Sequence, residues 1–393
     1  MKVLQITPSF HPAYVYGGAT RAVYDLCSNL AEGGCNVRVL TTDANGPHDV
    51  LKVDTKTDVI LADRLSARYC HRIMDVAVSP AFIEALPAAM KDCDVVHLNA
   101  VYSFTTIPAL IAARTFSRPI VWTPHGMFQR WLASKKNTVK SLWDWVCRVM
   151  SPRALVLHFT SEDERSESLG RFPGFESVVI PNSVELPTAM ERSQRNGCLR
   201  LLYLGRLDPK KGIENLIQAC GLLGRGASFV NWKLTIAGGG EDLYTRSLRD
   251  LVASEGLENR VTMAGQIEGE CKRQAFVNAD LVIVPSHTEN FGLVVGESLA
   301  YGVPVIASKG TPWRKVEEVG CGLWVENSPA ALADAVERAS AMRLDEMGEK
   351  GRDWITREFS GRSIARRMSE LYARVIRGKE PAGIKRARID RPA

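Results

Sequence analysis

The chain has 393 residues, of which 45% are hydrophobic and 24% are charged, and its formal net charge is +6. A chain of this length exceeds what one ordinary hydrophobic core accommodates, so we expect two domains of under about 200 residues each. The composition excludes a disordered or fibrous protein. The mildly basic charge permits contact with anionic substrates or an anionic membrane surface, but it does not demand nucleic acid, and we expect no nucleic acid partner.

The cysteines and the N-terminus indicate the cellular compartment. Nine cysteines are scattered along the chain, and none forms a CxxC pair or a zinc-type cluster, so we expect free thiols in a reducing compartment. The N-terminus shows no signal-peptide pattern. No window holds the about 18 consecutive apolar residues of a spanning helix. We therefore expect a cytoplasmic protein, either free or bound peripherally to the cytoplasmic face of the membrane.

Short apolar runs alternate with helical patterns in the first half of the chain. An amphipathic helix is expected at residues 17–34. The expected strands are residues 2–9, 36–43, 94–100, 119–126 and 155–161. Val- and Ile-rich runs with helical crossovers are typical of a parallel sheet that is covered on both faces.

The same pattern resumes in the second half, after a polar stretch with no periodic apolar face. Helices are expected to begin near Gly212 and Asp242. The expected strands are residues 199–207, 232–240, 260–265, 281–286 and 304–308. The polar stretch between the two patterns is typical of a linker.

We predict an α/β protein of two doubly wound, Rossmann-like domains that face each other across a cleft. The predicted organisation is an N-terminal Rossmann-like domain 1–186, a linker 187–197, a C-terminal Rossmann-like domain 198–358, a helix 359–380 that returns to the N-terminal domain, and a fraying basic tail 381–393.

Ligands of such sheets bind beyond the carboxyl ends of the strands, where helix N-termini present backbone N–H groups. Gly17 and Gly18 follow the first strand and precede the first helix, so a phosphate could approach the backbone closely there. Arg206 follows a second-domain strand, and Lys211 precedes a helix start. Cations in these places can neutralise a diphosphate. The alternatives are a tight turn without a ligand and ordinary solvated charges.

The segment "HTENFGLVVGESLAYGVPVIAS" begins at His287 and carries two carboxylates, Glu289 and Glu297, eight positions apart. The first precedes a Phe-Gly turn, and the second lies one turn inside the following helix. A carboxylate accepts two strong hydrogen bonds from vicinal hydroxyls, so this pair suits one sugar and one ribose.

Two histidines stand at strand ends on the expected ligand side. His97 lies in "VVHLN" and His125 in "TPHGMF". An imidazole at a strand end can bond a hydroxyl or phosphate, or exchange a proton near neutral pH. The alternative for each is a core histidine bonded to the backbone.

Residues 129–150 mix three tryptophans with basic side chains. Trp143, Val146 and Met150 recur at helical spacing and resemble an apolar stripe with basic flanks. Such a segment suits the membrane interface or an amphiphilic acceptor. The alternative is a helix that uses its tryptophans in the core.

Together these motifs resemble the retaining, nucleotide-sugar-dependent glycosyltransferases of the GT-B fold, family 4. The motifs that carry the resemblance span nearly the whole chain: "GGATRAV", "TPHGMF", "TSEDE", "IPNSVE", "YLGRLDPKKGIENLIQA", "IAGGGE" and "ENFGLVVGESLAYGVPVIAS". The last is similar to the Glu-x7-Glu signature of the family. The segment "GTPWRKVEEVGCGLWV" looks like the bacterial branch that builds exopolysaccharide or lipopolysaccharide.

The resemblance implies that domain 1–186 binds the acceptor and domain 198–358 the nucleotide sugar, and it implies a role for each candidate residue. Glu289 would lie beside the donor sugar, and Glu297 would hold the ribose hydroxyls. Arg206 and Lys211 would bind the diphosphate, and His125 would contact the sugar. The residues that would take part in catalysis are Glu289, His125, Arg206 and Lys211. The donor would also contact Gly17, Gly18, Asn290, Phe291, Gly292 and Leu293. The acceptor would contact His97, His125, Arg130 and Trp131. Asn290 replaces the glycine that is commoner in the family.

The predicted reaction is the transfer of a hexosyl group from a nucleoside diphosphate sugar to an acceptor hydroxyl, with retention of the anomeric configuration. The expected acceptor is a glycan or a lipid-linked molecule, and we expect neither a metal ion nor a cofactor because the cations take the place of the metal. The alternatives are a GT-B-fold nucleotide-sugar epimerase and a non-catalytic sugar-nucleotide-binding protein. A nicotinamide dehydrogenase is disfavoured because no full GxGxxG follows the first strand.

Overall fold

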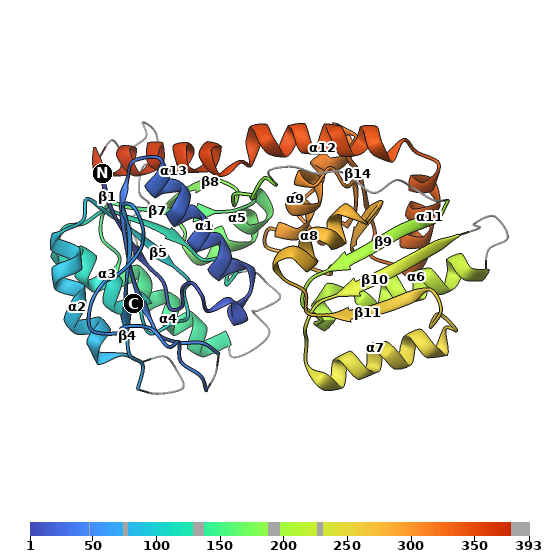
Figure 1. Cartoon of the computed structure of the whole chain (residues 1–393). Coiled ribbons are helices and arrows are strands. Elements are labelled where there is room, and N and C mark those ends of the chain that lie inside the picture. The colour runs from blue at the N-terminus through green and yellow to red at the C-terminus, as the bar shows by residue number, and fades with distance from the viewer. Residues whose placement is uncertain (47, 74–77, 129–136, 188–196, 226–230, 379–393) are drawn as a thin grey trace, which may run out of the picture. The chain divides into compact units, whose positions relative to one another are not determined.

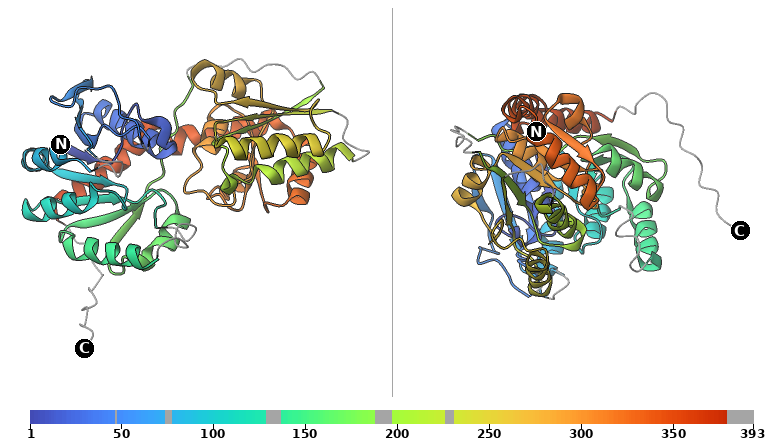
Figure 2. Two further views of the ribbon diagram at one scale, coloured as in Figure 1. Left: turned by 90° about the horizontal axis from the view of Figure 1, so that it is seen from below. Right: turned by 90° about the vertical axis from the view of Figure 1, so that its right-hand side faces the viewer.

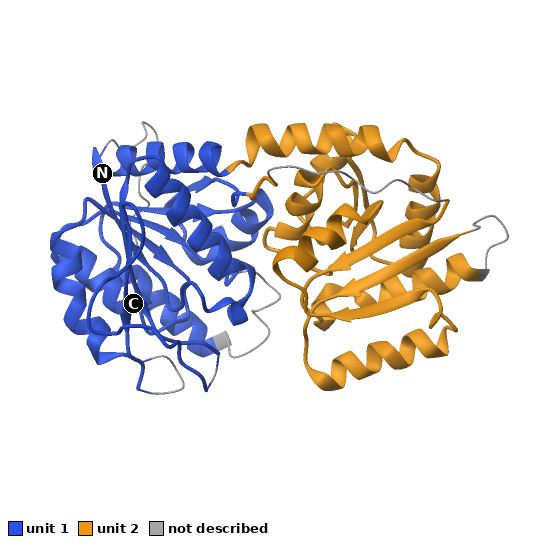
Figure 3. Cartoon of the chain, viewed as in Figure 1, with its two compact units in different colours: residues 1–183, 361–393 blue, residues 184–360 orange. Residues whose placement is uncertain are grey.

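The computed structural model describes residues 1–46, 48–73, 78–128, 137–187, 197–225 and 231–378 (Figure 1). The chain forms two compact units, each with its own sheet (Figure 3). Unit 1 comprises residues 1–183 and 361–393, and unit 2 comprises residues 184–360. Of the predicted linker, residues 188–196 lie outside the described residues, as does the predicted tail.

Unit 1 is built on a sheet whose described strands run in the order β3-β4-β2-β1-β5-β6-β7-β8. The strands are β1 (Lys2–Ile6), β2 (Asn36–Thr42), β3 (Val59–Ala62), β4 (Leu65–Cys70), β5 (Val95–Asn99), β6 (Ile120–Thr123), β7 (Leu155–Phe159) and β8 (Glu176–Val179). Neighbouring strands are parallel, except that β3 pairs with β4 in the antiparallel sense at one edge. The register places Gln5 opposite His97, so polar side chains of β1 and β5 meet inside the sheet layer.

Helices cover both faces of the unit 1 sheet (Figure 2). They are α1 (Gly18–Glu32), α2 (Pro80–Lys91), α3 (Thr106–Thr115), α4 (Asn137–Met150), α5 (Glu162–Ser168) and α13 (Gly361–Ile376). Successive strand residues point to opposite faces, so Val3 packs in the cluster of α1 and α13, whereas Leu4 packs in that of α2, α3 and α4. Helix α13 lies so close to α1 that a Cβ on Gly361 would be 1.9 Å from Asn29 Oδ1.

Unit 2 repeats the architecture with a parallel sheet of order β11-β10-β9-β12-β13-β14. Its strands are β9 (Leu199–Leu204), β10 (Trp232–Ala237), β11 (Val261–Gly265), β12 (Leu281–Val284), β13 (Val305–Ser308) and β14 (Gly322–Val325). Its helices are α6 (Ile213–Arg225), α7 (Asp242–Ser254), α8 (Gly269–Val277), α9 (Leu293–Ala300), α10 (Lys315–Val319), α11 (Pro329–Ser340) and α12 (Leu344–Glu358). Two apolar clusters again divide alternate strand residues between the two faces, as a doubly wound sheet requires. Two Rossmann-like α/β domains with parallel sheets are thus present.

Candidate functional site

The loop after β9 is fastened to the loop after β12 at the carboxyl edge of the unit 2 sheet. Asp208 caps a short 3-10 helix, Pro209–Lys211, by accepting from the Lys210 N–H at 3.0 Å. The His287 N–H donates to the Lys210 carbonyl at 2.8 Å. Gly212 follows in the left-handed conformation, and a Cβ there would lie 2.2 Å from the Pro285 carbonyl oxygen. This approach therefore requires glycine, and it carries Lys211 to the segment with the acidic motif.

Lys211 and Glu289 form an ion pair at this junction, with side chains 17% and 11% exposed. The Lys211 ammonium donates to Glu289 Oε1. The same oxygen accepts from Ser286 Oγ at 2.8 Å, and the Glu289 backbone N–H donates to the Gly310 carbonyl at 2.8 Å. These bonds fix the orientation of the Glu289 carboxylate and the position of its backbone.

The turn after Glu289 leads directly into α9. Gly292 is left-handed and caps the helix, while the buried Phe291 packs on Trp313 with ring centroids 5.1 Å apart. Trp313 Nε1 donates to the Phe291 carbonyl at 2.5 Å. Leu293 is the first helical residue, so the free N–H groups of the first turn lie beside this turn and form a local positive pole. The structure thus places Asn290, Phe291, Gly292 and Leu293 in one turn that joins the glutamate to the helix N-terminus.

Glu297 lies one turn into α9 and has its own lysine. Lys272, on α8, donates from Nζ to Glu297 Oε1 at 2.6 Å. Each acid of the motif therefore has a cationic partner from a different element. The role of Lys272 was missed in the sequence because nothing in its local pattern distinguishes it from other helical surface lysines.

Unpaired positive charge collects beside the Lys211–Glu289 pair. Arg206 is exposed, and in the part of the chain that the structure describes neither its guanidinium nor the Lys210 ammonium has a carboxylate partner. Burial, followed by the nearby Lys211 and Arg206 charges, lowers the pKa of Lys210 below its ordinary value, although the Glu289 and Asp208 carboxylates oppose this. Cations that repel one another in this way are stabilised by a bound anion.

In unit 1, the predicted glycines begin α1 at the carboxyl end of β1. Gly17 has a φ of 83° and caps the helix, and Gly18 is the first helical residue. The Gly17 N–H is already bonded to the Tyr14 carbonyl at 2.8 Å, so the first N–H groups of α1 itself remain for a ligand. Thr20 is buried, and its hydroxyl lies 3.3 Å from Ser9 Oγ.

His125 and His97 occupy different environments. His125 is half-buried in a turn after β6 with a φ of 51°, and its Nε2 lies 2.9 Å from Asn99 Oδ1. Burial lowers the pKa of His125 to about 3, so its ring is neutral at pH 7. His97 is fully buried, and its two ring nitrogens lie 2.6 Å from Thr123 Oγ1 and 2.6 Å from Tyr372 Oη. Its contacts are those of a core histidine, which favours that alternative over an acceptor contact, because β5 is covered on both faces.

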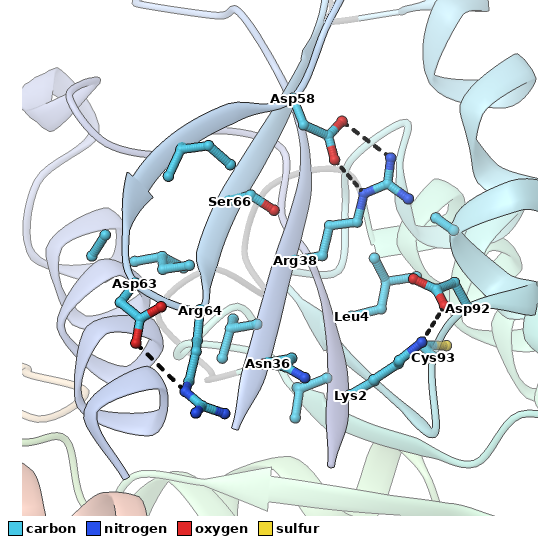
Figure 4. Close-up of a pocket in the computed structure, with 16 residues that line it drawn as sticks. Lys2, Leu4, Asn36, Arg38, Asp58, Asp63, Arg64, Ser66, Asp92 and Cys93 are labelled. Carbon is cyan, nitrogen blue, oxygen red and sulfur yellow. Dashed lines mark hydrogen bonds and ion pairs between the residues drawn. The ribbon is translucent and has the colours of Figure 1, made fainter. Parts of the chain in front are cut away.

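A separate cavity of about 670 Å³ opens at the amino ends of the unit 1 strands (Figure 4). It is the opposite edge from that of His125 and Gly17, because it is lined by Lys2 and Asn36, the first residues of β1 and β2. The charges that line it are paired with one another. The pairs are Lys2–Asp92 (2.6 Å), Arg38–Asp58 (2.8 Å) and Arg64–Asp63 (3.6 Å). This cavity therefore offers no uncompensated charge to a substrate.

Comparison with known proteins identifies the family. The family models described as "Glycosyltransferase Family 4" and "Glycosyl transferases group 1" match residues 16–187 and 191–355. The phosphatidyl-myo-inositol mannosyltransferase of Mycobacterium leprae is 31% identical over 86% of this chain and 86% of its own. The chain is a family 4 glycosyltransferase.

Other similarities agree with this assignment. The glycogen synthase of Mycobacterium tuberculosis is 28% identical over 96% of each chain. Among solved structures, the Anabaena protein HepE in complex with UDP-glucose superimposes with a TM-score of 0.70 at 19% identity, covering 95% of this chain and 99% of that one. At this identity the superposition shows the shared GT-B fold.

Helix α4 of the glycosyltransferase exposes an apolar stripe other than the one predicted from the sequence. Arg130 and Trp131 lie outside the described residues. Trp143 and Met150 pack in the core, and Trp143 Nε1 donates to the Val101 carbonyl at 3.0 Å, so the predicted stripe faces inward. The other side of α4 exposes a second apolar stripe, whose members are 43–63% exposed: Val139, Leu142, Trp145 and Val149. Of the two alternatives left open by the sequence, the packing of Trp143 and Met150 favours a helix that uses this stripe in the core, whereas the exposed stripe was not among the predictions.

No helix among the described residues is long and apolar enough to cross a membrane. Nor do three His, Cys, Asp or Glu side chains come together within the described ranges in a way that could hold a metal ion.

Proposed function

We propose that this glycosyltransferase moves a hexosyl group from a nucleoside diphosphate sugar to an acceptor hydroxyl, with retention of the anomeric configuration. The observation that carries the proposal is the junction of the loops after β9 and β12, which joins Lys211 to Glu289 beside the unpaired Arg206 and Lys210. A diphosphate bears about two to three negative charges and would relieve the repulsion among these cations. The N-terminus of α9 adds N–H groups to the same edge.

The hydrogen bonding of Glu289 suits it to holding the sugar. Oε1 is occupied by Lys211 and Ser286, whereas Oε2 has no hydrogen bond within the described residues and can accept from sugar hydroxyls. A carboxylate whose charge is shared with an ammonium is a weak nucleophile, so a covalent intermediate on Glu289 is disfavoured. Glu297, held by Lys272, would accept from the ribose hydroxyls.

Retention then follows from a same-face route. The bond from the anomeric carbon to the diphosphate breaks, the departing diphosphate takes the proton of the acceptor hydroxyl, and the acceptor oxygen bonds the sugar on the same face. Arg206 and Lys211 stabilise the charge that develops on the leaving group, and each such group contributes about 100-fold in rate. The proposal requires no metal ion, because these cations do the work that a divalent ion would do.

A thermal-shift screen over nucleotide sugars tests the donor class. A ligand that binds only the folded protein raises its apparent stability, so the most stabilising compound identifies the donor. Turnover is then measured with glycan and with lipid-linked acceptors in the presence of a chelator. Proton NMR identifies the anomer of the product. Failure of every nucleotide sugar to stabilise the protein, an inverted product or loss of turnover with the chelator would each contradict one part of the proposal. Conversion of the donor without acceptor would indicate an epimerase.

We further propose that the acceptor is lipid-linked, in exopolysaccharide or lipopolysaccharide assembly, and that α4 docks on the cytoplasmic membrane face. The exposed stripe of α4 supports this because Arg148 flanks it and Arg114 Nη1 bonds the Val149 carbonyl at 2.7 Å. An apolar helix face with basic neighbours binds anionic lipid surfaces. The relative from Mycobacterium leprae is named for a lipid acceptor.

Vesicle sedimentation tests the docking. With vesicles rich in anionic lipid, Leu142→Glu combined with Trp145→Glu should weaken binding at least about tenfold, because burial of each apolar side chain contributes about 1.5–3 kcal/mol. Leu243→Glu, at an exposed apolar position of unit 2, is the matched control and should bind as the wild type does. Equal binding of all three proteins would refute the role of α4.

A further inference from the structure

The loop between β13 and α10 fastens the turn before α9 by two backbone groups of that turn. The Glu289 N–H donates to the Gly310 carbonyl at 2.8 Å, and Trp313 Nε1 donates to the Phe291 carbonyl at 2.5 Å. Position 310 has to be glycine, because a Cβ there would lie 2.3 Å from the Ser286 carbonyl oxygen. The segment "GTPWRKVEEVGCGLWV" thus supplies two anchors for this turn, and all of these residues belong to unit 2.

The bond from Trp313 sets the direction of the peptide group that follows Phe291. The Phe291–Gly292 bond is trans, and a trans peptide directs its C=O and its N–H to opposite sides. Because the buried indole holds the carbonyl, the Gly292 N–H points away from Trp313. Gly292 is partly exposed, and its N–H has no acceptor within the described residues. Glycine tolerates both signs of φ, so this peptide would be free to rotate if its carbonyl were not bound.

Trp313 is itself held by the residues at which unit 2 begins and ends. Its ring centroid lies 5.3 Å from that of Phe359 and 5.8 Å from that of Trp354. The N–H of Val184, the first residue of unit 2, donates to the Phe359 carbonyl at 2.8 Å. A Cβ on Gly296 would lie 2.5 Å from Val184 Cγ2 and 3.4 Å from Trp313 Cη2, so α9 packs closely against both side chains. The indole is therefore enclosed and has little room to turn.

The oriented N–H lies close to the cations of unit 2. A Cβ on Gly292 would be 3.6 Å from Glu289 Cγ, and the Glu289 carboxylate binds the Lys211 ammonium. Lys210 and Arg206 lie near the same pair, and their charges act on one another. An anion that is attracted to these cations therefore comes close to a backbone donor whose direction Trp313 has already set.

We propose that Trp313 is a positioning residue for the donor: its indole fixes the Phe291–Gly292 peptide so that the Gly292 N–H donates to an oxygen of the diphosphate. The diphosphate as ligand rests on the proposed function. The indole is a donor only, so phenylalanine at this position keeps an aromatic ring in the cluster but leaves the Phe291 carbonyl free. The freed peptide rotates, and the phosphate then loses a fixed donor although no charge has been removed from the site.

Calorimetry of the full chain with UDP, GDP and ADP tests the role of the indole N–H. Trp313→Phe is compared with Trp354→Phe, because Trp354 is equally buried in the same ring cluster and has no hydrogen bond to the turn in the described structure. Both variants should lose similar stability in urea. Only Trp313→Phe should weaken binding of the diphosphate, by about fivefold or more, since a hydrogen bond to a charged group contributes about tenfold or more. Unchanged affinity in Trp313→Phe, or an equal loss in both variants, would overturn the proposal.

NMR of the same proteins observes the Gly292 N–H directly. Of the 12 phenylalanines only Phe291 precedes a glycine, so labelling of phenylalanine carbonyl carbon and glycine nitrogen selects this one amide. A nucleoside diphosphate that binds should move the Gly292 proton toward its hydrogen-bonded value in the wild type and in Trp354→Phe, and less in Trp313→Phe. A Gly292 signal that ignores a bound diphosphate would overturn the proposal and leave the proposed function standing. Absence of binding by UDP, GDP and ADP to the wild type would refute both.

Discussion

Replacement of Lys211 by methionine separates its structural role from its role toward the donor. The ammonium bonds Glu289 Oε1, and the two side chains are 17% and 11% exposed, so the pair is largely shielded from water. At an effective dielectric of about 20, opposite charges at about 4 Å attract by about 4 kcal/mol, and desolvation offsets a part of this. We expect Lys211→Met to lower the free energy of unfolding by about 2–3 kcal/mol, since it leaves the carboxylate with Ser286 alone.

A double-mutant cycle with Glu289→Gln measures the pair itself. Lys211→Met, Glu289→Gln and the double variant are unfolded in urea and followed by circular dichroism, and the expected coupling is about 1–2 kcal/mol. Lys309→Met is the control, because it breaks an exposed ion pair with Glu326 and should change the free energy by less than about 0.5 kcal/mol. Additive effects of the two substitutions would refute the reasoning about the pair.

The catalytic role of Lys211 is measured on the same variant. Loss of one charge that stabilises the leaving group costs a few kcal/mol in the transition state, so turnover of Lys211→Met should fall at least about tenfold at saturating donor. The measurement is made at a temperature where circular dichroism shows the variant to be folded. Turnover near that of the wild type would remove Lys211 from the proposed mechanism, whatever the unfolding result.

Three further predictions concern other parts of the glycosyltransferase. Arg206→Ala should lower turnover at least about tenfold with little change in urea unfolding, because the side chain is exposed and has no partner in the described structure; a large loss of stability would contradict this. Gly212→Ala should destabilise by about 2 kcal/mol or more, because its Cβ would lie 2.2 Å from the Pro285 carbonyl oxygen; wild-type unfolding would show that the loop junction is not tight. The pKa of His158, about 4, lies below its unfolded value of about 6.5, so stability should be lost as the pH falls from about 6.5 to 4. His97 and His125 contribute in the same direction, so His158→Gln should make this dependence shallower, and an equal slope in both proteins would contradict the assignment.

Features that depend on a few neighbouring residues were predictable from the sequence, and those that depend on distant residues were not. The expected strands at residues 2–9, 94–100 and 281–286 are present as β1, β5 and β12, because their residues are buried on both faces and mostly apolar. Strands β3, β4, β8 and β14 were missed. In β3, alternate residues are exposed at the sheet edge, and β4 contains Arg68, so neither reads as a buried run.

The candidate site residues also divide into those predictable from neighbouring residues and those that depend on distant contacts. Gly212 and Gly292 could be predicted at loop-to-helix turns because each precedes an expected helix, and both are left-handed in the structure. The sequence left open whether the Trp143 stripe of α4 is covered, because an amphipathic pattern with tryptophans on several faces does not say which stripe faces the core. The burial of His97 likewise depended on α13, whose Tyr372 lies 275 positions further along the chain.

Local chemistry in the sequence therefore determined the Rossmann-like units, the glycine turns and the edge at which charged side chains collect, because hydrophobic periodicity and backbone restriction act over a few residues. The tertiary structure alone decided which partner each polar group has: Lys211 with Glu289, Lys272 with Glu297, and Asn99 with His125. Those pairings join strands and helices that are far apart in the chain. They depend on sheet order and helix packing, which no short stretch of residues encodes.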